Sequence, residues 1–214
     1  MRIEKVVTSG VFSLDGEDFD VDNNVWLVEV SDPDGAASGG TPGSVIVIDA
    51  AHDAGRIVEA LRGRDVSAIV CTHGHNDHIN AAGELSDRTG APILLHAADR
   101  MLWDVVYADR PPTAELTDGA SIGPLEVLHT PGHSPGAVSL LLAEANVVFT
   151  GDTLFSGGPG ATGRSYSDFP TILASISSRL LTLPPETTVH TGHGESTTIG
   201  AEAPSLEEWR ARGH

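Results

Sequence analysis

The feature that most constrains the fold is a short apolar run that ends in a cluster of metal-binding residue types. Residues 68–72 (Ala-Ile-Val-Cys-Thr) predict a strand buried on both faces, and His73-Gly-His75-Asn-Asp77-His78 follows it directly. In open α/β sheets, functional residues gather where the carboxyl ends of strands open into loops. Imidazole and carboxylate groups are good zinc ligands, and imidazole also suits iron. The segment therefore predicts a metal site at a sheet edge.

The spacing within this segment suggests two points of convergence rather than one. His73 and His75 alternate in an extended turn and can aim at the same point. Asp77 and His78 enter the next helix, so they can aim at a second point a few ångströms away.

Three further candidates follow later predicted strands, and each lies beside a glycine that lets the backbone turn sharply. They are His133 in Pro-Gly-His-Ser-Pro-Gly, Asp152 in Thr-Gly-Asp-Thr-Leu-Phe, and His193 in Thr-Gly-His-Gly. A single histidine after a strand is most often an ordinary turn residue. Seven such residues, each after a strand, favour one shared metal centre.

The rest of the pattern mixes strands and helices in both halves, which predicts an α/β sandwich formed by a single domain, residues 1–214. We expect strands at 6–7, 25–28, 44–49, 92–95, 125–129, 137–142, 146–150 and 189–190. We expect helices at 54–62, 79–88, 97–107 and 168–181, the last capped by Asp168, and a final helix capped by Ser205. Loops are expected at 31–43 and 156–167.

Composition excludes several classes of protein. The chain has 12 Lys+Arg against 30 Asp+Glu, and a formal charge of −18 argues against binding nucleic acid. No apolar run approaches the roughly 18 residues that span a bilayer, and no secretory signal precedes the first strand, so a cytoplasmic location is expected. The one cysteine, Cys71, rules out an internal disulfide framework and is expected to be a packed apolar residue. The oligomeric state is left open.

The order of these motifs resembles the metallo-β-lactamase superfamily, and most of all its glyoxalase II-like group in a short single-domain form. The arginine-rich, GC-biased composition looks actinobacterial. The resemblance implies an αββα sandwich, with two mixed β-sheets flanked by helices and a two-metal site at one edge. It further implies a first metal held by His73, His75 and His133, a second held by Asp77, His78 and His193, and Asp152 bridging both.

Two positions narrow the subgroup. The commonest β-lactamases of the superfamily carry cysteine where Asp152 stands, and flavo-diiron proteins carry glutamate where His75 stands. Penicillin hydrolysis and the flavo-diiron branch are therefore disfavoured.

The implied activity is hydrolysis of a small acyl or hydroxyacyl thioester of a glutathione- or mycothiol-type thiol. A metal-bridging hydroxide attacks the carbonyl, and Asp77 orients it and takes its proton. The ions are expected to be zinc, with iron or manganese as alternatives. Gly163-Arg164-Ser165-Tyr166 resembles the glyoxalase II stretch that grips the thiol, which makes Arg164 and Tyr166 the expected substrate contacts. Asp49 either hydrogen-bonds a ligand histidine or caps the turn before the 54–62 helix.

The sequence leaves three other functions open. One is a persulfide dioxygenase with a single iron held by residues like His73, His133 and Asp152. Others are a hydrolase of lactones or other small esters, and a metal-binding protein without turnover. Among the remaining histidines, His52 either lines the pocket or lies at the surface, and the surface is the expected place. For His96, His129 and His190 we expect packing in the core or against the ligands.

Overall fold

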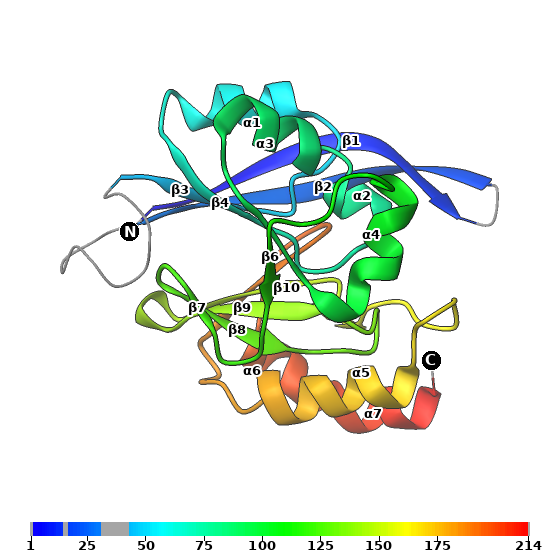
Figure 1. Ribbon diagram of the computed structural model, residues 1–214. Coiled ribbons are helices and arrows are strands. Elements are labelled where there is room, and N and C mark those ends of the chain that lie inside the picture. Colours follow the sequence, from blue (N-terminus) through cyan, green and yellow to red (C-terminus); the bar gives the residue numbers. More distant parts are fainter. Residues whose placement is uncertain (1, 15–16, 31–42, 214) are drawn as a thin grey trace.

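The computed structural model describes residues 2–14, 17–30 and 43–213. It contains two six-stranded sheets that lie face to face between two layers of helices (Figure 1). The αββα sandwich expected from the sequence is confirmed. The loop expected at 31–43 lies, apart from Gly43, outside the described residues.

The first sheet has the strand order β1-β2-β3-β4-β5-β6. Its strands are β1 (Ile3–Leu14), β2 (Glu17–Glu29), β3 (Val45–Ile48), β4 (Val66–Val70), β5 (Ile93–His96) and β6 (Ala114–Leu116). Strands β3 to β6 are parallel to one another, whereas β1 and β2 form an antiparallel hairpin that joins β3 antiparallel. The carboxyl ends of β3, β4 and β5 therefore share one edge of the sheet.

The second sheet has the order β14-β13-β10-β9-β8-β7. Its strands are β7 (Ser121–Ile122), β8 (Leu125–His129), β9 (Val138–Leu142), β10 (Val147–Gly151), β13 (Thr188–Thr191) and β14 (Thr197–Thr198). Strand β10 is parallel to β13, and both β8 and β10 are antiparallel to β9. Hence β8, β10 and β13 run in the same direction. A small hairpin, β11 (Leu154–Phe155) and β12 (Gly158–Pro159), follows β10.

Helices cover the outer face of each sheet. On the first sheet lie α1 (Ala54–Leu61) and α3 (Ala82–Thr89), with α2 (Asn76–Ile79) and α4 (Arg100–Val106) near the site, and a 3₁₀ turn (Ala97–Asp99) leads into α4. On the second sheet lie α5 (Phe169–Ser175), which continues as a π-helical stretch (Ile176–Leu180), and then α6 (Ile199–Glu202) and α7 (Leu206–Arg212).

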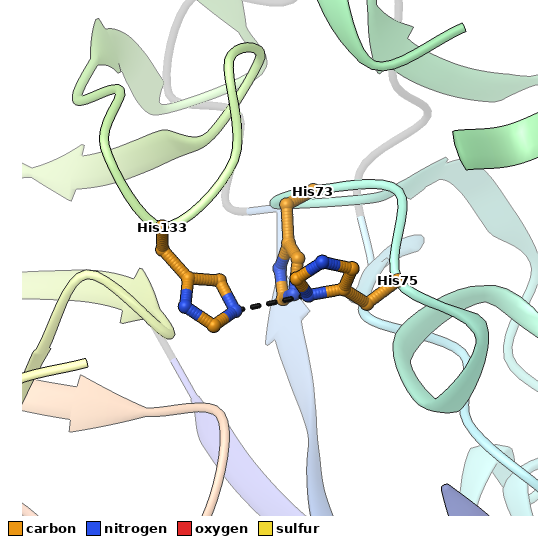
Figure 2. A group of neighbouring side chains, drawn as sticks. All are labelled: His73, His75 and His133. Carbon is orange, nitrogen blue, oxygen red and sulfur yellow. Dashed lines mark hydrogen bonds between the residues drawn. The ribbon is translucent and has the colours of Figure 1, made fainter. Parts of the chain in front are cut away.

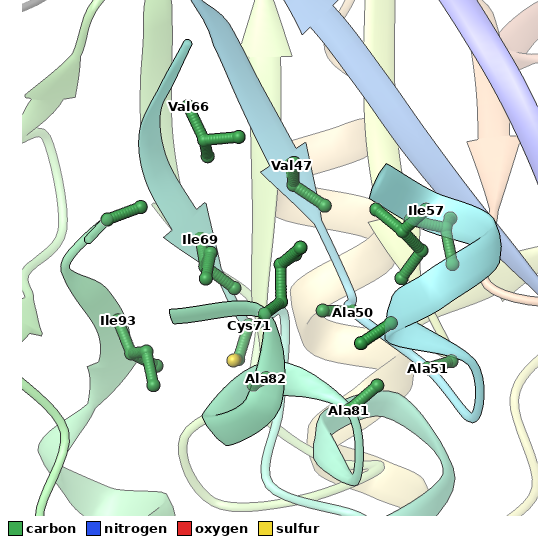
Figure 3. Packing of buried hydrophobic residues seen from close by; sticks show 14 of the residues in the cluster. Val47, Ala50, Ala51, Ile57, Val66, Ile69, Cys71, Ala81, Ala82 and Ile93 are labelled. Atoms are coloured by element: carbon green, nitrogen blue, oxygen red, sulfur yellow. The ribbon is translucent and has the colours of Figure 1, made fainter. Parts of the chain in front are cut away.

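Successive side chains of a strand point to opposite faces of the sheet, so one set packs against the helices and the other packs between the two sheets. In β3, Val45 and Val47 pack under the helices of the first sheet, whereas Ile46 and Ile48 pack between the two sheets. All four residues are buried, so the expected strand with two buried faces is confirmed. Figure 3 shows the outer cluster around Val47 and Cys71; Cys71 is fully buried, and burial raises the pKa of its thiol well above its usual value. The packed role expected for Cys71 is confirmed.

Several boundaries differ from those expected. The strands at 6–7 and 25–28 are short parts of the long β1–β2 hairpin, whose far end is exposed and carries acidic residues that hide its strand pattern. The helix at 79–88 is two helices, α2 and α3, that turn at residues 80–81. Asp168 caps α5 by accepting from Thr171 N, as expected.

The cap expected at Ser205 is wrong. Ser205 ends a 3₁₀ turn with helical backbone angles, so its hydroxyl makes no capping hydrogen bond to α7. In the described part of the chain, no helix is both long and apolar enough to span a membrane.

Candidate metal centre

The turn after β4 positions the first four candidate residues. His73 and His75 lie in the turn itself, and Asp77 and His78 lie in the short helix α2. Gly74 is needed between the two histidines, because a Cβ there would lie 2.9 Å from Leu102 Cβ and 3.0 Å from a backbone oxygen.

One group of ligand atoms comes from His73, His75 and His133, and Figure 2 shows the three rings turned toward one another. Their candidate ligand atoms all lie within 4.8 Å of one another. His75 Nδ1 is 2.9 Å from His133 Nε2, and His73 Nε2 is buried without any hydrogen-bond partner. Three nitrogen lone pairs can therefore face one small volume.

A second group of ligand atoms comes from Asp77, His78 and His193. His78 Nε2 lies 3.1 Å from His193 Nε2, and the two nitrogens lie 3.4 and 3.3 Å from Asp77 Oδ2. The group belongs to two elements, α2 and the turn after β13, which only the packing of the two sheets brings together.

Asp152 follows β10 and lies between the two groups. Its Oδ2 is 3.5 Å from His133 Nε2 and 3.5 Å from His193 Nε2, and its Oδ1 is 3.4 Å from His78 Nε2. The Oδ1 atom is buried and has no hydrogen-bond partner. A Cβ on Gly192 would lie 2.4 Å from this same oxygen, so only glycine leaves the carboxylate its place.

The chemistry of these side chains fits a metal site. Two buried polar atoms, His73 Nε2 and Asp152 Oδ1, have no partner in a region where such groups are normally satisfied. All seven candidate side chains are nitrogen or oxygen ligands of the kind that divalent zinc or iron accepts. The donors therefore fit divalent metal ions.

Burial and neighbouring charges shift the pKa values of the site's side chains. Burial, and then the neighbouring His133, lower the pKa of His75 to about 3, and burial lowers that of His73 well below its usual value. Burial opposes ionisation of Asp152, but His78 and His193 outweigh it and hold the pKa of the carboxyl well below its usual value. These shifts leave His73 and His75 neutral and Asp152 ionised, the protonation states of metal ligands. Burial opposes protonation of His78 and His193, but Asp152 and Asp77 outweigh it: they raise the pKa of His193 to about 10 and that of His78 well above its usual value. A metal ion bound by these two rings would therefore displace their protons.

Outer contacts fix the orientation of the histidines. His78 Nδ1 is 3.0 Å from Asp49 Oδ2, His133 Nδ1 is 2.8 Å from Ala161 O, and His193 Nδ1 is 2.8 Å from Asp22 O. In each ring one nitrogen is thus engaged outside and the other faces the centre, the arrangement that orients metal-binding histidines.

Of the two roles expected for Asp49, the structure fits the contact with a histidine. Its carboxylate also accepts from Thr72 N and Thr72 Oγ1, both at 2.7 Å. The other interpretation, a cap on the turn before α1, is wrong, because Asp53 caps α1 by accepting from Arg56 N at 2.9 Å.

Asp99 is a residue of the site that the sequence did not reveal. Its buried carboxylate accepts from Gly74 N at 2.8 Å, from Ser134 Oγ at 2.6 Å and from Gly136 N at 2.5 Å. It therefore joins the turn that carries His75 to the loop that carries His133. The sequence signals for it are two glycines, because a Cβ would lie 3.0 Å from Asp99 O at Gly74 and 2.7 Å from Asp99 N at Gly136.

His52 is not a surface residue as expected, because its ring is part of a hydrogen-bonded chain. Asn80 Nδ2 can only donate, so it fixes His52 Nδ1, 3.0 Å away, as an acceptor. His52 Nε2 then donates to Asn23 Oδ1 at 2.8 Å, and Asn23 Nδ2 donates to Asp77 Oδ2 at 3.1 Å. Both His52 and Asn23 thus act on the orientation of Asp77.

His96, His129 and His190 pack, as expected, whereas His214 lies outside the described residues. The rings of His96 and His129 stack with centroids 4.3 Å apart, and His190 stacks on Trp26 at 4.0 Å.

A cleft of about 290 Å³ opens beside His75. It is lined by Phe12, Gly74, His75, Asn76, Leu102, Val105, Val106, Arg164, Ser165 and Tyr166. The Arg164 guanidinium lies 5.3 Å from the centre of the Phe12 ring, and Tyr166 is 60% exposed. Both residues expected to contact substrate therefore lie at the cleft next to a candidate metal ligand.

Comparison with known proteins identifies the family. The model of the metallo-β-lactamase superfamily matches residues 19–193, a span that contains all seven candidate ligands. The chain belongs to the metallo-β-lactamase superfamily. Proteins of this superfamily are generally metal-dependent hydrolases, which agrees with the metal-binding and hydrolase character expected from the sequence.

Named superfamily members resemble the chain over most of its length. Hydroxyacylglutathione hydrolase GloC of Haemophilus influenzae is 33% identical over 178 residues, which cover 73% of this chain and 82% of that protein. The crystal structure of TTHA1623 in a di-iron-bound form is 33% identical, with a TM-score of 0.73, and the match covers 86% of this chain and 93% of that one. The crystal structure of the B3 metallo-β-lactamase BLEG-1 is 30% identical, with a TM-score of 0.71, and the match covers 92% of this chain and 97% of that one.

Proposed function

We propose that the protein hydrolyses small acyl or hydroxyacyl thioesters with the help of two divalent metal ions. The observation that carries the proposal is the position of Asp152, whose two oxygens face both groups of ligand atoms at 3.4–3.5 Å. The identity with a hydroxyacylglutathione hydrolase supports the thioester as substrate.

The residues divide into two ligand sets. His73, His75 and His133 would hold one ion, Asp77, His78 and His193 the other, and Asp152 would contact both. Bound divalent ions supply a hydroxide at neutral pH, by lowering the pKa of water, and they polarise a substrate carbonyl. Zinc suits this donor set, and iron is the alternative that a di-iron-bound relative supports.

Asp77 is the group that orients the attacking water and accepts its proton. Burial opposes its ionisation, but His78 and the hydrogen bonds from His193 and Asn23 outweigh this and lower the pKa of the carboxyl. Its Oδ2 is held by Asn23, so the carboxylate has a fixed direction. As the new C–O bond forms, the C–S bond breaks, and the thiolate that leaves requires no strong general acid.

Arg164 and Tyr166 provide contacts for the thiol part of the substrate. A guanidinium recognises a carboxylate through paired hydrogen bonds, and a phenol can donate one more. Arg164 brings positive charge to the cleft of a chain whose formal charge is −18, so it gives an anionic thiol a place to bind.

The test is metal analysis of the purified protein combined with a panel of thioesters followed by thiol release. The proposal predicts two divalent ions per chain and turnover of at least one acyl or hydroxyacyl thioester. Asp152→Ala and His133→Ala are expected to lose metal and activity together. Glu84→Ala, at an exposed position on α3, is the matched control and is expected to keep both.

A second candidate is hydrolysis of β-lactams. Asp152 in place of cysteine disfavours the commonest type of β-lactamase, but the 30% identity with the B3 metallo-β-lactamase BLEG-1 favours this activity. The same hydroxide can attack a strained amide carbonyl. A chromogenic cephalosporin in the same panel decides between the two: turnover of the cephalosporin without turnover of any thioester would replace the first proposal with the second.

A further inference from the structure

The part of the cleft lining that comes from α4 is apolar and partly faces solvent. Val105, on α4, is 83% exposed, and Leu102 and Val106 on the same helix are partly buried. Together the three aliphatic side chains give the cleft an apolar surface, and covering such a surface with an apolar group is favourable.

The charged residues of α4 do not line the cleft. Arg100 Nε lies 2.6 Å from Asp104 Oδ1, and this exposed pair satisfies both groups on the helix itself. Trp103 points the other way, fully buried in the core under the first sheet. Helix α4 therefore offers the cleft only its aliphatic side chains, Leu102, Val105 and Val106.

The cleft is also continuous with the reacting centre. Gly74 and His75 belong both to its lining and to the turn that carries candidate metal ligands. The residues that line it in the described part of the chain include no carboxylate, although the sequence has 30 acidic residues. An apolar group attached to the scissile bond can therefore extend from the centre onto α4 without meeting a buried charge.

We infer that Leu102, Val105 and Val106 form an acyl-binding wall, and that the preferred substrates carry an unbranched apolar acyl group of several carbons rather than a short hydroxyacyl group. This inference rests on the proposed thioester hydrolase function. The wall excludes water from the acyl chain, and Arg164 holds the anionic thiol part. Selectivity then increases with each methylene that the wall covers.

The test compares acyl chain length in turnover and in binding. Acetyl, butanoyl and hexanoyl thioesters, together with the lactoyl thioester, are offered on two carriers, glutathione and N-acetylcysteine. We expect kcat/KM to rise roughly three- to fourfold per added methylene on both carriers. In Val105→Asn this dependence flattens, whereas Met101→Asn, on the same helix, 42% exposed and outside the cleft lining, keeps it.

A binding measurement separates this inference from the proposed function. Calorimetry with the non-hydrolysable S-methyl and S-hexyl thioethers of both carriers needs no turnover. The S-hexyl compounds must bind more tightly than the S-methyl compounds, with a more negative heat-capacity change. Equal affinity, or a preference for lactoyl over hexanoyl thioesters, would overturn the acyl-binding wall while leaving a thioester hydrolase intact.

Loss of turnover with every thioester, together with tighter S-hexyl binding, would reject the proposed reaction and keep the apolar subsite. If Val105→Asn instead dissociates an oligomer, as seen by light scattering, and leaves the chain-length dependence unchanged, the wall is a contact between copies of this chain and the inference is wrong.

Discussion

Two imidazole nitrogens, His75 Nδ1 and His133 Nε2, lie 2.9 Å apart although 58 positions separate the two residues in the chain. One residue follows a strand of the first sheet and the other follows a strand of the second. Their approach is therefore a product of the whole sandwich. One proton can be shared between the two nitrogens, and a cation bound at this position would take both lone pairs in its place.

Metal removal should destabilise the fold. An ion that binds only the folded chain adds about 2.7 kcal/mol when its free concentration is 100 times its Kd. We expect a chelator to lower the Tm and added zinc or iron to restore it, as measured by calorimetry. An unchanged Tm in a sample shown to lose its metal would contradict a site that links the two sheets.

Asp99→Asn should weaken both stability and metal binding. In this variant, one of the three buried groups that donate hydrogen bonds to Asp99 faces an amide nitrogen that cannot accept. We expect the free energy of unfolding to fall by about 1–3 kcal/mol. Because Asp99 joins the turn of His75 to the loop of His133, we also expect weaker binding of one ion out of two. Urea unfolding and metal titration measure the two effects, and Asp104→Asn, at an exposed position, is the control. Unaltered metal affinity would show that Asp99 does not affect metal binding and contributes only to the stability of the fold.

Asn23→Leu should lower kcat roughly 10- to 100-fold, the usual effect of losing a partner that orients a ligand. The substitution removes the donor to Asp77 Oδ2 but keeps the volume of the side chain. His52→Leu is expected to act in the same direction, and His52→Gln, which can still donate to Asn23, should recover part of the loss. If kcat stays at the wild-type level in all three variants, the hydrogen bonds that run from His52 through Asn23 do not position Asp77.

Folding stability should fall as the pH drops from about 6.5 to about 4, in part because of His190. Burial, and then the charge of Lys5, lower the pKa of its imidazole from 6.5 to about 4. A depressed pKa in the folded state means that the unfolded chain takes up the proton first, so stability is complete above pH 6.5 and is lost below it. In His190→Phe, which keeps an aromatic ring stacked on Trp26, we expect the loss between pH 7.5 and 5 to be about 1–2 kcal/mol smaller in urea unfolding. An equal loss in both proteins would show that His190 does not contribute.

Local sequence patterns predicted the parts of the fold whose signal is local. Strand β3 was recognisable because four consecutive apolar residues serve two cores, and α1 because Ile57 and Leu61 lie at helical spacing. The candidate ligands were recognisable because each follows a strand and lies near a glycine.

The rest depended on contacts between distant segments. In the sequence, Asp99 is an ordinary residue before a helix. It becomes a shared acceptor only because the 3₁₀ turn after β5 lies against the loop of His133. The position of His52 depends on Asn80 and Asn23, which lie in other elements. The outer part of the β1–β2 hairpin buries few side chains, so its alternation of apolar and polar residues gives a weak signal.

Direct evidence for two ions held by seven side chains would come from anomalous X-ray diffraction. Crystals of the purified protein are measured at the absorption edges of zinc and iron. We expect two peaks, one among His73, His75 and His133 and one among Asp77, His78 and His193, with Asp152 in contact with both. A single peak, or a metal bound elsewhere while these side chains contact only one another, would contradict this expectation.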